Sequence, residues 1–303
     1  MSRHIGSLRA GAFAGALYLI SSLSIPALAA SQSPPVFSSN PSVGWYSYKR
    51  EFIAPASGPG PILQDPAHPY VSNDDFRLTG KQPTFRVGDP NNSILQPWAS
   101  DAIRKYNELV LSGKPDFSLH ASCYPVGVLE FLLEPMTRPM YIVQGPKEVV
   151  MILSSFNDVR RIYLSDKHSE NAKPSWYGDS IGHYEGDTLV VDTIGQNDKT
   201  MVDGFHTPHT DKLHVVERFH LVDNGETLEV NVHVEDPGTF TTPWNAIQRY
   251  RRYEDTVRRA SPAALAVLAT PDEGPLMEAI CAENPNSLGM GERTIPQTTK
   301  PDF

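Results

Sequence analysis

The side chains best suited to proton transfer lie in the loop 203–211 and in His214 just after it, which together contain three histidines and two aspartates. Imidazoles exchange protons near neutral pH, so we predict that His209 and His214 act as proton carriers. Together with His206, these histidines could instead bind a divalent metal ion, but their spacing matches no established metal motif. The loop therefore predicts acid–base chemistry without a cofactor, with a metal ion at His206, His209 and His214 as the alternative.

A hairpin follows this loop, and its turn determines which side chains share a face. Asn224-Gly225 is a strong hairpin signal, and a two-residue turn there pairs Asp223 with Glu226. One face then carries the pairs Leu221/Leu228, Phe219/Val230, Glu217/Val232 and Val215/Val234. The other face carries the pairs His220/Glu229, Arg218/Asn231, Val216/His233 and His214/Glu235. This second face is either a solvated sheet surface or the polar wall of a cavity.

Glu217 is the single acid on the apolar face of this hairpin. A carboxylate in such surroundings must be paired, lie at an open end of the sheet or face a ligand cavity. We predict that Glu217 is a general acid or base, with His209 and His214 as its proton partners. Arg218 would contact an anion or oxyanion if its own face lines the pocket. The structural alternative is a salt bridge from Glu217 to Arg249.

An aromatic pair between residues 166 and 179 is suited to ligand binding. Trp176 and Tyr177, beside His168, could stack on a sugar or an aromatic ring. A loop that covers one end of a barrel would contain such side chains equally well. The predicted binding residues are Trp176, Tyr177, His168, Asp192 and His183.

The segment Gly178-Asp179-Ser180-Ile181-Gly182 matches the letters of the nucleophile elbow of serine hydrolases. That motif needs a strand before the serine and a helix after it, whereas a hairpin is predicted after Ser180. The sequence therefore disfavours a serine hydrolase. A two-residue turn at Glu185-Gly186 would place Asp179 opposite Asp192, where the two carboxylates could share a proton, hold a metal or lie in water.

Short strands dominate the region that must position these side chains. Between Pro139 and residue 253, apolar residues recur with a period of two and no helix is predicted. The predicted strands are 140–144, 148–153, 159–164, 180–184, 188–192, 212–221, 227–235 and 245–253. This pattern predicts a mainly β fold, an antiparallel meander that forms a barrel or a barrel-like sandwich with a few short helices.

One helix is predicted before these strands and helical segments after them. Pro97 suits the first position of a helix over 97–111, which would end before Ser112-Gly113. Its packed face would carry Trp98, Ala102, Tyr106 and Leu109. A further helical region is predicted near 262–282.

Composition and charge limit the class of the protein. The chain has 303 residues, of which 40% are hydrophobic and 20% charged, so it can bury a core and is not expected to be disordered. Its 26 Lys and Arg against 35 Asp and Glu give a net charge of −9, which argues against a nucleic-acid partner. We expect a small-molecule ligand or substrate instead.

The first residues predict a secretory signal peptide. Arg3 and Arg9 precede an apolar run, and Ala27-Leu28-Ala29 fits a small-x-small cleavage site. We therefore expect a secreted or periplasmic protein, and the remainder contains no apolar run long enough to span a bilayer. An exported protein meets an oxidising environment, and Cys123 and Cys281 are an even number of cysteines. We therefore expect a disulfide between them, with two free buried thiols as the alternative.

Three regions make up the predicted domain organisation. The signal peptide covers residues 1–29, and a proline-rich extended arm covers 30–95. The β-barrel-like domain covers 96–303, with helical segments near 97–111 and 262–282.

Part of the chain resembles a large group of uncharacterised exported bacterial proteins. The likeness runs over about residues 95–284 and is most specific in the hairpin Gly-Asp-Ser-Ile-Gly-His-Tyr-Glu-Gly-Asp-Thr-Leu-Val-Val-Asp-Thr of residues 178–193. Members of the group typically have His in place of Asp179, Trp in place of Tyr184 and Gly-Phe-Asn in place of 195–197. The resemblance implies export and a shared β-rich architecture. The hairpins are also similar in style to those of lipocalins, a likeness of fold that carries no function.

Three functions fit the sequence. The first is an exported, cofactor-independent enzyme that acts on a small organic molecule such as a sugar derivative by acid–base chemistry, as a lyase, isomerase or hydrolase. The second is a non-catalytic carrier of an apolar or aromatic ligand, and the third is a surface interaction protein. An enzyme should gather titratable groups around one pocket, a carrier should enclose an apolar cavity, and an interaction protein should expose an apolar patch.

Overall fold

The computed structural model describes residues 35–37, 44–47, 49–72, 75–76, 79–114, 119–120, 124–135, 139–154 and 158–252. The predicted signal peptide, the helical region near 262–282 and both cysteines, Cys123 and Cys281, lie outside these residues. Among the helices of the described residues, none is long and apolar enough to cross a membrane.

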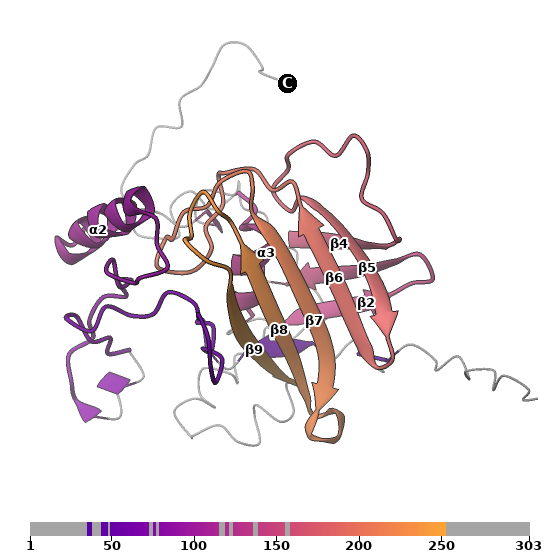
Figure 1. The fold of residues 1–303 in the computed structure, drawn as a ribbon. Helices are drawn as coiled ribbons and strands as arrows, with labels where there is room; N and C mark the ends of the chain where they lie inside the picture. The colour runs from indigo at the N-terminus through magenta and orange to yellow at the C-terminus, as the bar shows by residue number, and fades with distance from the viewer. Residues whose placement is uncertain are drawn as a thin grey trace, which may run out of the picture. The chain divides into compact units, whose positions relative to one another are not determined.

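In the described part of the chain, nine strands form a closed barrel and follow one another around it in chain order (Figure 1). They are β1 (Trp45–Ser47), β2 (Met140–Gln144), β3 (Glu148–Leu153), β4 (Asp158–Leu164), β5 (Asp179–Glu185), β6 (Thr188–Ile194), β7 (His214–Val222), β8 (Thr227–Glu235) and β9 (Trp244–Arg252). The predicted mainly β barrel is confirmed. The strands β2 to β9 differ from their predicted ranges by no more than two residues at either end.

One pair of neighbouring strands is parallel, which a purely antiparallel meander does not include. β4 and β5 pair through Tyr163 with Ile181 and Leu164 with Gly182. A two-residue turn can join antiparallel strands, whereas a parallel pair needs a connection of about a dozen residues or more. Residues 165–178 supply that connection, so the barrel is mixed.

β1 closes the barrel, although it comes from the predicted proline-rich arm. Trp45 pairs with Met140 of β2 and with Arg252 of β9. The buried indole of Trp45 donates its Nε1 hydrogen to the carbonyl oxygen of Phe37 at 3.1 Å. This part of the arm is therefore a strand of the barrel.

The β7–β8 hairpin has the predicted register. Phe219 pairs with Val230 and Glu217 with Val232. The turn contains Asn224 at φ 57° and Gly225 at φ 88°, the left-handed conformation that a tight hairpin turn of this kind requires. The side chains of β7 and β8 therefore divide between the interior and the outer face as the turn predicts.

The β5–β6 hairpin is shifted by two residues from its predicted register. Ile181, and not Asp179, pairs with Asp192, because the turn residues are Gly186 and Asp187. Gly186 has φ 61° and takes the first central position of the turn, where glycine is favoured. The predicted direct opposition of Asp179 and Asp192 is therefore wrong.

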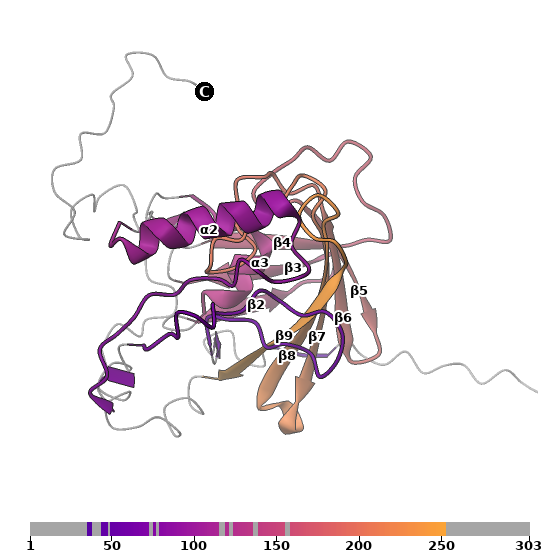
Figure 2. The same cartoon turned by 60° about the vertical axis from the view of Figure 1, so that its left-hand side comes forward.

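A short helix that the sequence analysis did not predict fills the barrel interior. All seven residues of α3 (Gly127–Leu133) are buried, and it lies within the ring of strands in Figures 1 and 2. The carbonyl oxygen of Leu132 accepts hydrogen bonds from Tyr250 Oη at 2.7 Å and from Gln248 Nε2 at 3.3 Å. At the other end of α3, the amide of Val128 donates to Gln196 Oε1 at 3.1 Å.

The helix α2 (Pro97–Leu111) has the predicted bounds but packs through a different face. Its buried residues are Ala99, Ile103, Asn107 and Val110, so the packed face is rotated by about one residue from the predicted one. Asn107 Nδ2 donates to the carbonyl oxygen of Gly88 at 2.7 Å, which explains a polar residue on that face. Trp98 is left exposed on this helix, which runs beside the barrel (Figure 2).

Candidate functional site

Glu217 lies inside the barrel in a two-pronged ion pair with Arg160. Arg160 Nη1 donates to Glu217 Oε1 at 2.7 Å, Nη2 binds Oε2, and both side chains are 0% exposed. Arg160 Nη2 also donates to Thr193 Oγ1 at 3.1 Å and lies 3.4 Å from Ser180 Oγ. Because both carboxylate oxygens are occupied and out of contact with solvent, we assign Glu217 to the packing of the interior and not to proton transfer.

The expected alternative partner of Glu217, Arg249, is on the outer face of the barrel. Its Nε donates to Glu229 at 2.7 Å. Ser180, the serine of the predicted elbow letters, is buried and lies 2.8 Å from Thr193 Oγ1. Ser180 therefore belongs to the hydrogen-bond network of the interior.

The polar face of the β7–β8 hairpin is the outer surface of the barrel. Arg218 forms an exposed ion pair with Glu185, and His183 Nε2 lies 3.0 Å from the same carboxylate. His214 is likewise on this surface, as its alternation with buried Val215 requires. Of the two expectations for this face, the solvated sheet surface is the one observed, and Arg218 is not among the residues that line the hollow described below.

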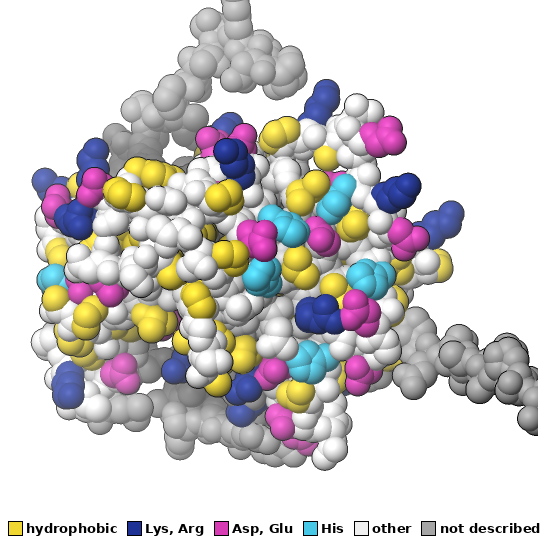
Figure 3. Space-filling view, in the orientation of Figure 1, with side chains coloured by type: hydrophobic (Ala, Val, Ile, Leu, Met, Phe, Trp, Pro, Cys, Tyr) yellow, Lys and Arg dark blue, Asp and Glu magenta, His cyan; other side chains and the backbone are white. Residues whose placement is uncertain are grey.

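Histidines and carboxylates alternate on this outer surface, as the space-filling view shows (Figure 3). His168 joins Asp179 through Nδ1 at 3.1 Å and Asp192 through Nε2 at 3.0 Å. His214 Nε2 lies 3.1 Å from the same Asp192 oxygen, and its Nδ1 lies 3.7 Å from Glu235. The structure therefore brings together three predicted site residues, His168, Asp192 and His214. We call the five residues Asp179, His168, Asp192, His214 and Glu235 the histidine–carboxylate row.

The aromatic pair docks the 165–178 connection onto the barrel. Tyr177 Oη donates to Asp158 at 2.7 Å, and its ring meets Phe131 of α3 edge-on at 5.7 Å. Trp176 stacks on Tyr124 with ring centroids 5.3 Å apart. These contacts fit the alternative expectation of a loop that covers the barrel end.

The three loop histidines do not come together. His206 stacks on Tyr106 at 4.0 Å, whereas His209 contacts Thr200 and His214 belongs to the histidine–carboxylate row. Among the described residues, no group of three His, Cys, Asp or Glu side chains is arranged to hold a metal ion.

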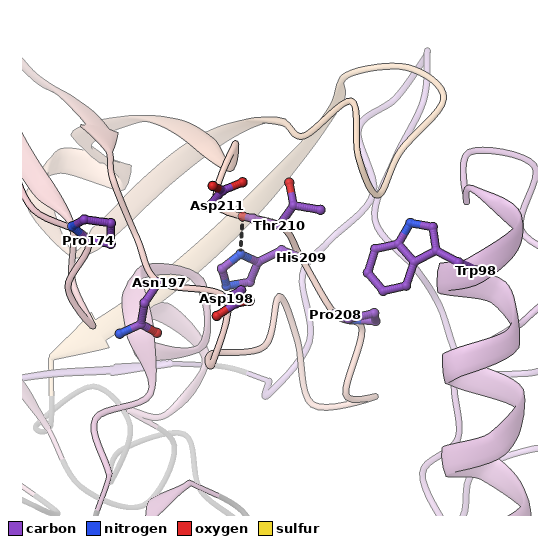
Figure 4. A pocket seen from close by; sticks show the side chains of 8 residues that line it. All are labelled: Trp98, Pro174, Asn197, Asp198, Pro208, His209, Thr210 and Asp211. Carbon is purple, nitrogen blue, oxygen red and sulfur yellow. Dashed lines mark hydrogen bonds between the residues drawn. The ribbon is translucent and has the colours of Figure 1, made fainter.

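An open hollow of about 610 Å³ lies at the end of the barrel where α2 meets the β6–β7 connection. A volume of this size is typical of small-molecule sites, which span roughly 300–1,000 Å³. In Figure 4, Trp98 stands on one side of the hollow, Pro174 and Asn197 on the other, and His209 between them. The lining residues are Trp98, Pro174, Asn197, Asp198, Pro208, His209, Thr210 and Asp211.

His209 is held in one orientation beneath this hollow. Its Nδ1 donates to the carbonyl oxygen of Thr210 at 2.9 Å, so Nε2 carries the lone pair and accepts from Thr200 Oγ1 at 2.6 Å. The side chain is only 3% exposed, and burial lowers the pKa of the imidazole. The bond to the Thr210 carbonyl and the charges of Asp236 and Asp198 oppose this effect on the pKa but do not outweigh it, so the imidazole is neutral at neutral pH.

Asp236 connects the two sides of the hollow, although the sequence analysis did not single it out. Its carboxylate accepts from the Thr210 amide and hydroxyl, both at 2.6 Å, and from the Gly238 amide at 3.0 Å. The Gly238 carbonyl in turn accepts from Trp98 Nε1 at 2.6 Å. Asp236 is buried and links the backbone next to His209 to Gly238, whose carbonyl binds Trp98.

A second group of titratable side chains is buried between α3 and the start of β4. His120 lies 3.1 Å from Asp158 and 3.7 Å from Glu134, which also pairs with Arg50. Burial opposes the charged imidazole, but its bonds to both carboxylates outweigh that effect and raise the pKa of His120 to about 9. Burial, with the nearby charge of Glu134, raises the pKa of Glu130 to about 8. None of these residues lines the hollow.

Comparisons with protein-family models, curated proteins and solved structures find no match to this chain. The resemblance to the exported bacterial group therefore stays a prediction, as does export itself. The function has to be inferred from the geometry of the site.

Proposed function

We propose that the protein is an exported enzyme that performs acid–base chemistry on a small organic molecule bound in the hollow at the barrel end. The observation that carries the proposal is the gathering of Asp198, His209 and Asp211 around this one hollow. Titratable groups that converge on a concave site are the pattern expected of an enzyme.

His209 supplies the base in this proposal. A neutral imidazole with one nitrogen fixed by a carbonyl has its lone pair at a defined position, as general-base catalysis requires. Nε2 is occupied by the buried Thr200 hydroxyl in the structure, so the proposal requires that hydroxyl to turn away when substrate binds, and the charges of Asp236 and Asp198 then stabilise the imidazolium that forms. Asp211, which is exposed in the hollow, serves as the second proton-transfer group.

The carrier alternative has less support in the described interior. A lipocalin-like carrier needs an apolar cavity inside its barrel, whereas α3 and the Arg160–Glu217 pair occupy this one. Because the side chains of α3 pack against the strands in the interior, we place the ligand in the hollow outside the barrel.

Products analysed by mass spectrometry test the proposal. The full chain is incubated with neutral and uronic-acid disaccharides, sugar lactones and small polyols. Hydrolysis adds the mass of water, elimination cleaves without that gain, and isomerisation leaves the mass unchanged. We expect wild-type turnover of at least one compound, with kcat/KM reduced by roughly a hundredfold or more in Asp211→Asn and in His209→Gln.

Asp187→Asn is the matched control, because Asp187 is an exposed carboxylate in the β5–β6 turn, outside the hollow. It should retain wild-type turnover. Circular dichroism checks that each variant is folded. The proposal would be contradicted if no compound of the panel is turned over. It would also be contradicted if folded Asp211→Asn and His209→Gln turn over substrate as fast as the wild type.

A further inference from the structure

We infer that the hollow takes a neutral sugar ring, stacked on the indole of Trp98. The inference names a substrate class for the site proposed above, and it rests on that proposal for the chemistry that follows binding. Three features of the lining carry it: a fixed aromatic face, hydrogen-bonding groups that match hydroxyls, and the absence of a cationic side chain from the lining residues.

Trp98 lines the hollow and leaves much of its indole accessible there. It lies on the exposed side of α2, where 46% of the residue remains accessible. Its Nε1 hydrogen is used in the 2.6 Å bond to the Gly238 carbonyl, which fixes the plane of the indole. An aromatic ring whose polar edge is satisfied offers an apolar face for stacking. The C–H face of a pyranose ring is such a partner.

The polar lining groups suit a molecule rich in hydroxyls. Asp198 and Asp211 accept hydrogen bonds, and the Asn197 side chain both donates and accepts them. Neighbouring hydroxyls of a sugar can donate to a carboxylate and accept from an amide at the same time. A few polar groups beside one aromatic surface are a common way to orient a small ligand.

The charge of the hollow selects against anions. Its lining contains two carboxylates and neither Lys nor Arg, and burial keeps His209 neutral. Three lysines adjoin lining residues in the chain, Lys173, Lys199 and Lys212, but none of them is among the lining residues, and Lys199 is turned toward the Trp176 ring, with Nζ 6.0 Å from its centroid. Phosphorylated sugars and uronic acids would meet like charge on entering this site.

A quaternary ammonium ligand fits the lining less well than a neutral sugar. Cages for such cations are built from several aromatic faces around the charge. Here Trp98 alone among the lining residues supplies an exposed aromatic face, and proline rings at 174 and 208 take the remaining apolar positions. The neutral sugar is therefore the ligand class that the lining favours.

The frame behind the hollow is already in place for such a ligand. Asp236 ties Thr210 and Gly238 together, and Gly238 holds Trp98. A ligand that bridges the indole and the Asp211 side of the hollow would therefore order few additional side chains. Pre-organisation of this kind lowers the entropic cost of binding.

Titration calorimetry of the full chain with cellobiose, maltose, lactose and trehalose tests the inference. At least one of these neutral disaccharides should bind saturably, while choline and glucuronate should bind more weakly or not at all. Trp98→Ala should weaken binding by roughly tenfold or more, because it removes the stacking surface. Tyr163→Ala is the matched control, since Tyr163 is an exposed aromatic residue of β4 outside the hollow.

The outcomes separate this inference from the proposed enzyme. Failure of all four disaccharides to bind, tighter binding of choline, or unchanged affinity in Trp98→Ala would overturn the neutral-sugar site. Turnover of another compound that depends on Asp211 would then leave the enzyme proposal standing. Trp98-dependent disaccharide binding without turnover of any compound would support the sugar site and overturn the enzyme.

Discussion

The Arg160–Glu217 ion pair is buried in the barrel interior, with both side chains out of contact with solvent. Removing one member of such a pair leaves an uncompensated charge in an apolar interior, which typically costs about 3–5 kcal/mol. We therefore expect Glu217→Ala to lower the free energy of unfolding by that amount in a urea titration. The double variant Arg160→Met/Glu217→Leu should recover most of the loss, because no charge is then buried.

The exposed Arg218–Glu185 pair on the outer face provides the control. Glu185→Ala should cost less than about 1 kcal/mol, since solvent screens that pair. Equal losses in Glu217→Ala and Glu185→Ala would show that the interior pair does not have the role assigned to it.

The sequence predicts the surroundings of Glu217 but not its partner. The Asn224-Gly225 turn places Glu217 among apolar neighbours, as observed. Arg160 comes from another hairpin, so local pairing cannot identify it. One indication was present: in a strand that contains Arg160-Arg161, successive side chains point to opposite faces, so one arginine must point inward and needs a carboxylate.

At the scale of elements, the cluster between α3 and β4 should make stability depend on pH. The pKa of His120 is raised from 6.5 to about 9, so its contribution is complete below pH 6.5 and is lost as the pH rises through about 9. The pKa of Glu130 is raised from 4.5 to about 8, so the folded state retains a proton that the unfolded chain releases, and stability falls between these values. Both effects predict a lower free energy of unfolding at pH 9.5 than at pH 6.

Urea unfolding of wild type and Glu130→Gln across pH 5 to 9.5 measures this dependence. The variant should lose the part of the decline that lies between pH 4.5 and 8 and keep the part that comes from His120. A wild-type stability that rises over the same range would contradict the assignment of the cluster.

Individual turns and helices differ in how far the sequence predicts them. Asn224-Gly225 determined a register correctly because both residues adopt positive φ in a tight turn. In the β5–β6 turn, Gly186 could take either the second central position, as predicted, or the first, as observed, and the sequence alone does not distinguish the two. α3 was missed because a seven-residue helix buried on all sides has no polar face and therefore no helical periodicity.

At the scale of the whole molecule, the hollow is assembled from segments that are far apart in the chain. α2 supplies Trp98, the 165–178 connection supplies Pro174, and the β6–β7 connection supplies the remaining lining residues. His209 is predictable as a site residue from its chemistry, whereas Trp98 is predicted only as a packed residue of a helix. Their proximity depends on the barrel and on the Asp236 frame, which local patterns do not reveal.

The most direct test of the central claim, that the hollow is where a small neutral molecule binds, is a ¹H–¹⁵N correlation spectrum of the full chain titrated with the disaccharides named above. The chain has four tryptophans, and Trp98→Phe identifies the indole signal of Trp98. We expect that signal and the amides of Asn197, Asp198 and Asp211 to shift together, while those of the interior residues Val230 and Val232 stay in place. Shifts centred on the barrel interior, or none at saturating disaccharide, would contradict the account.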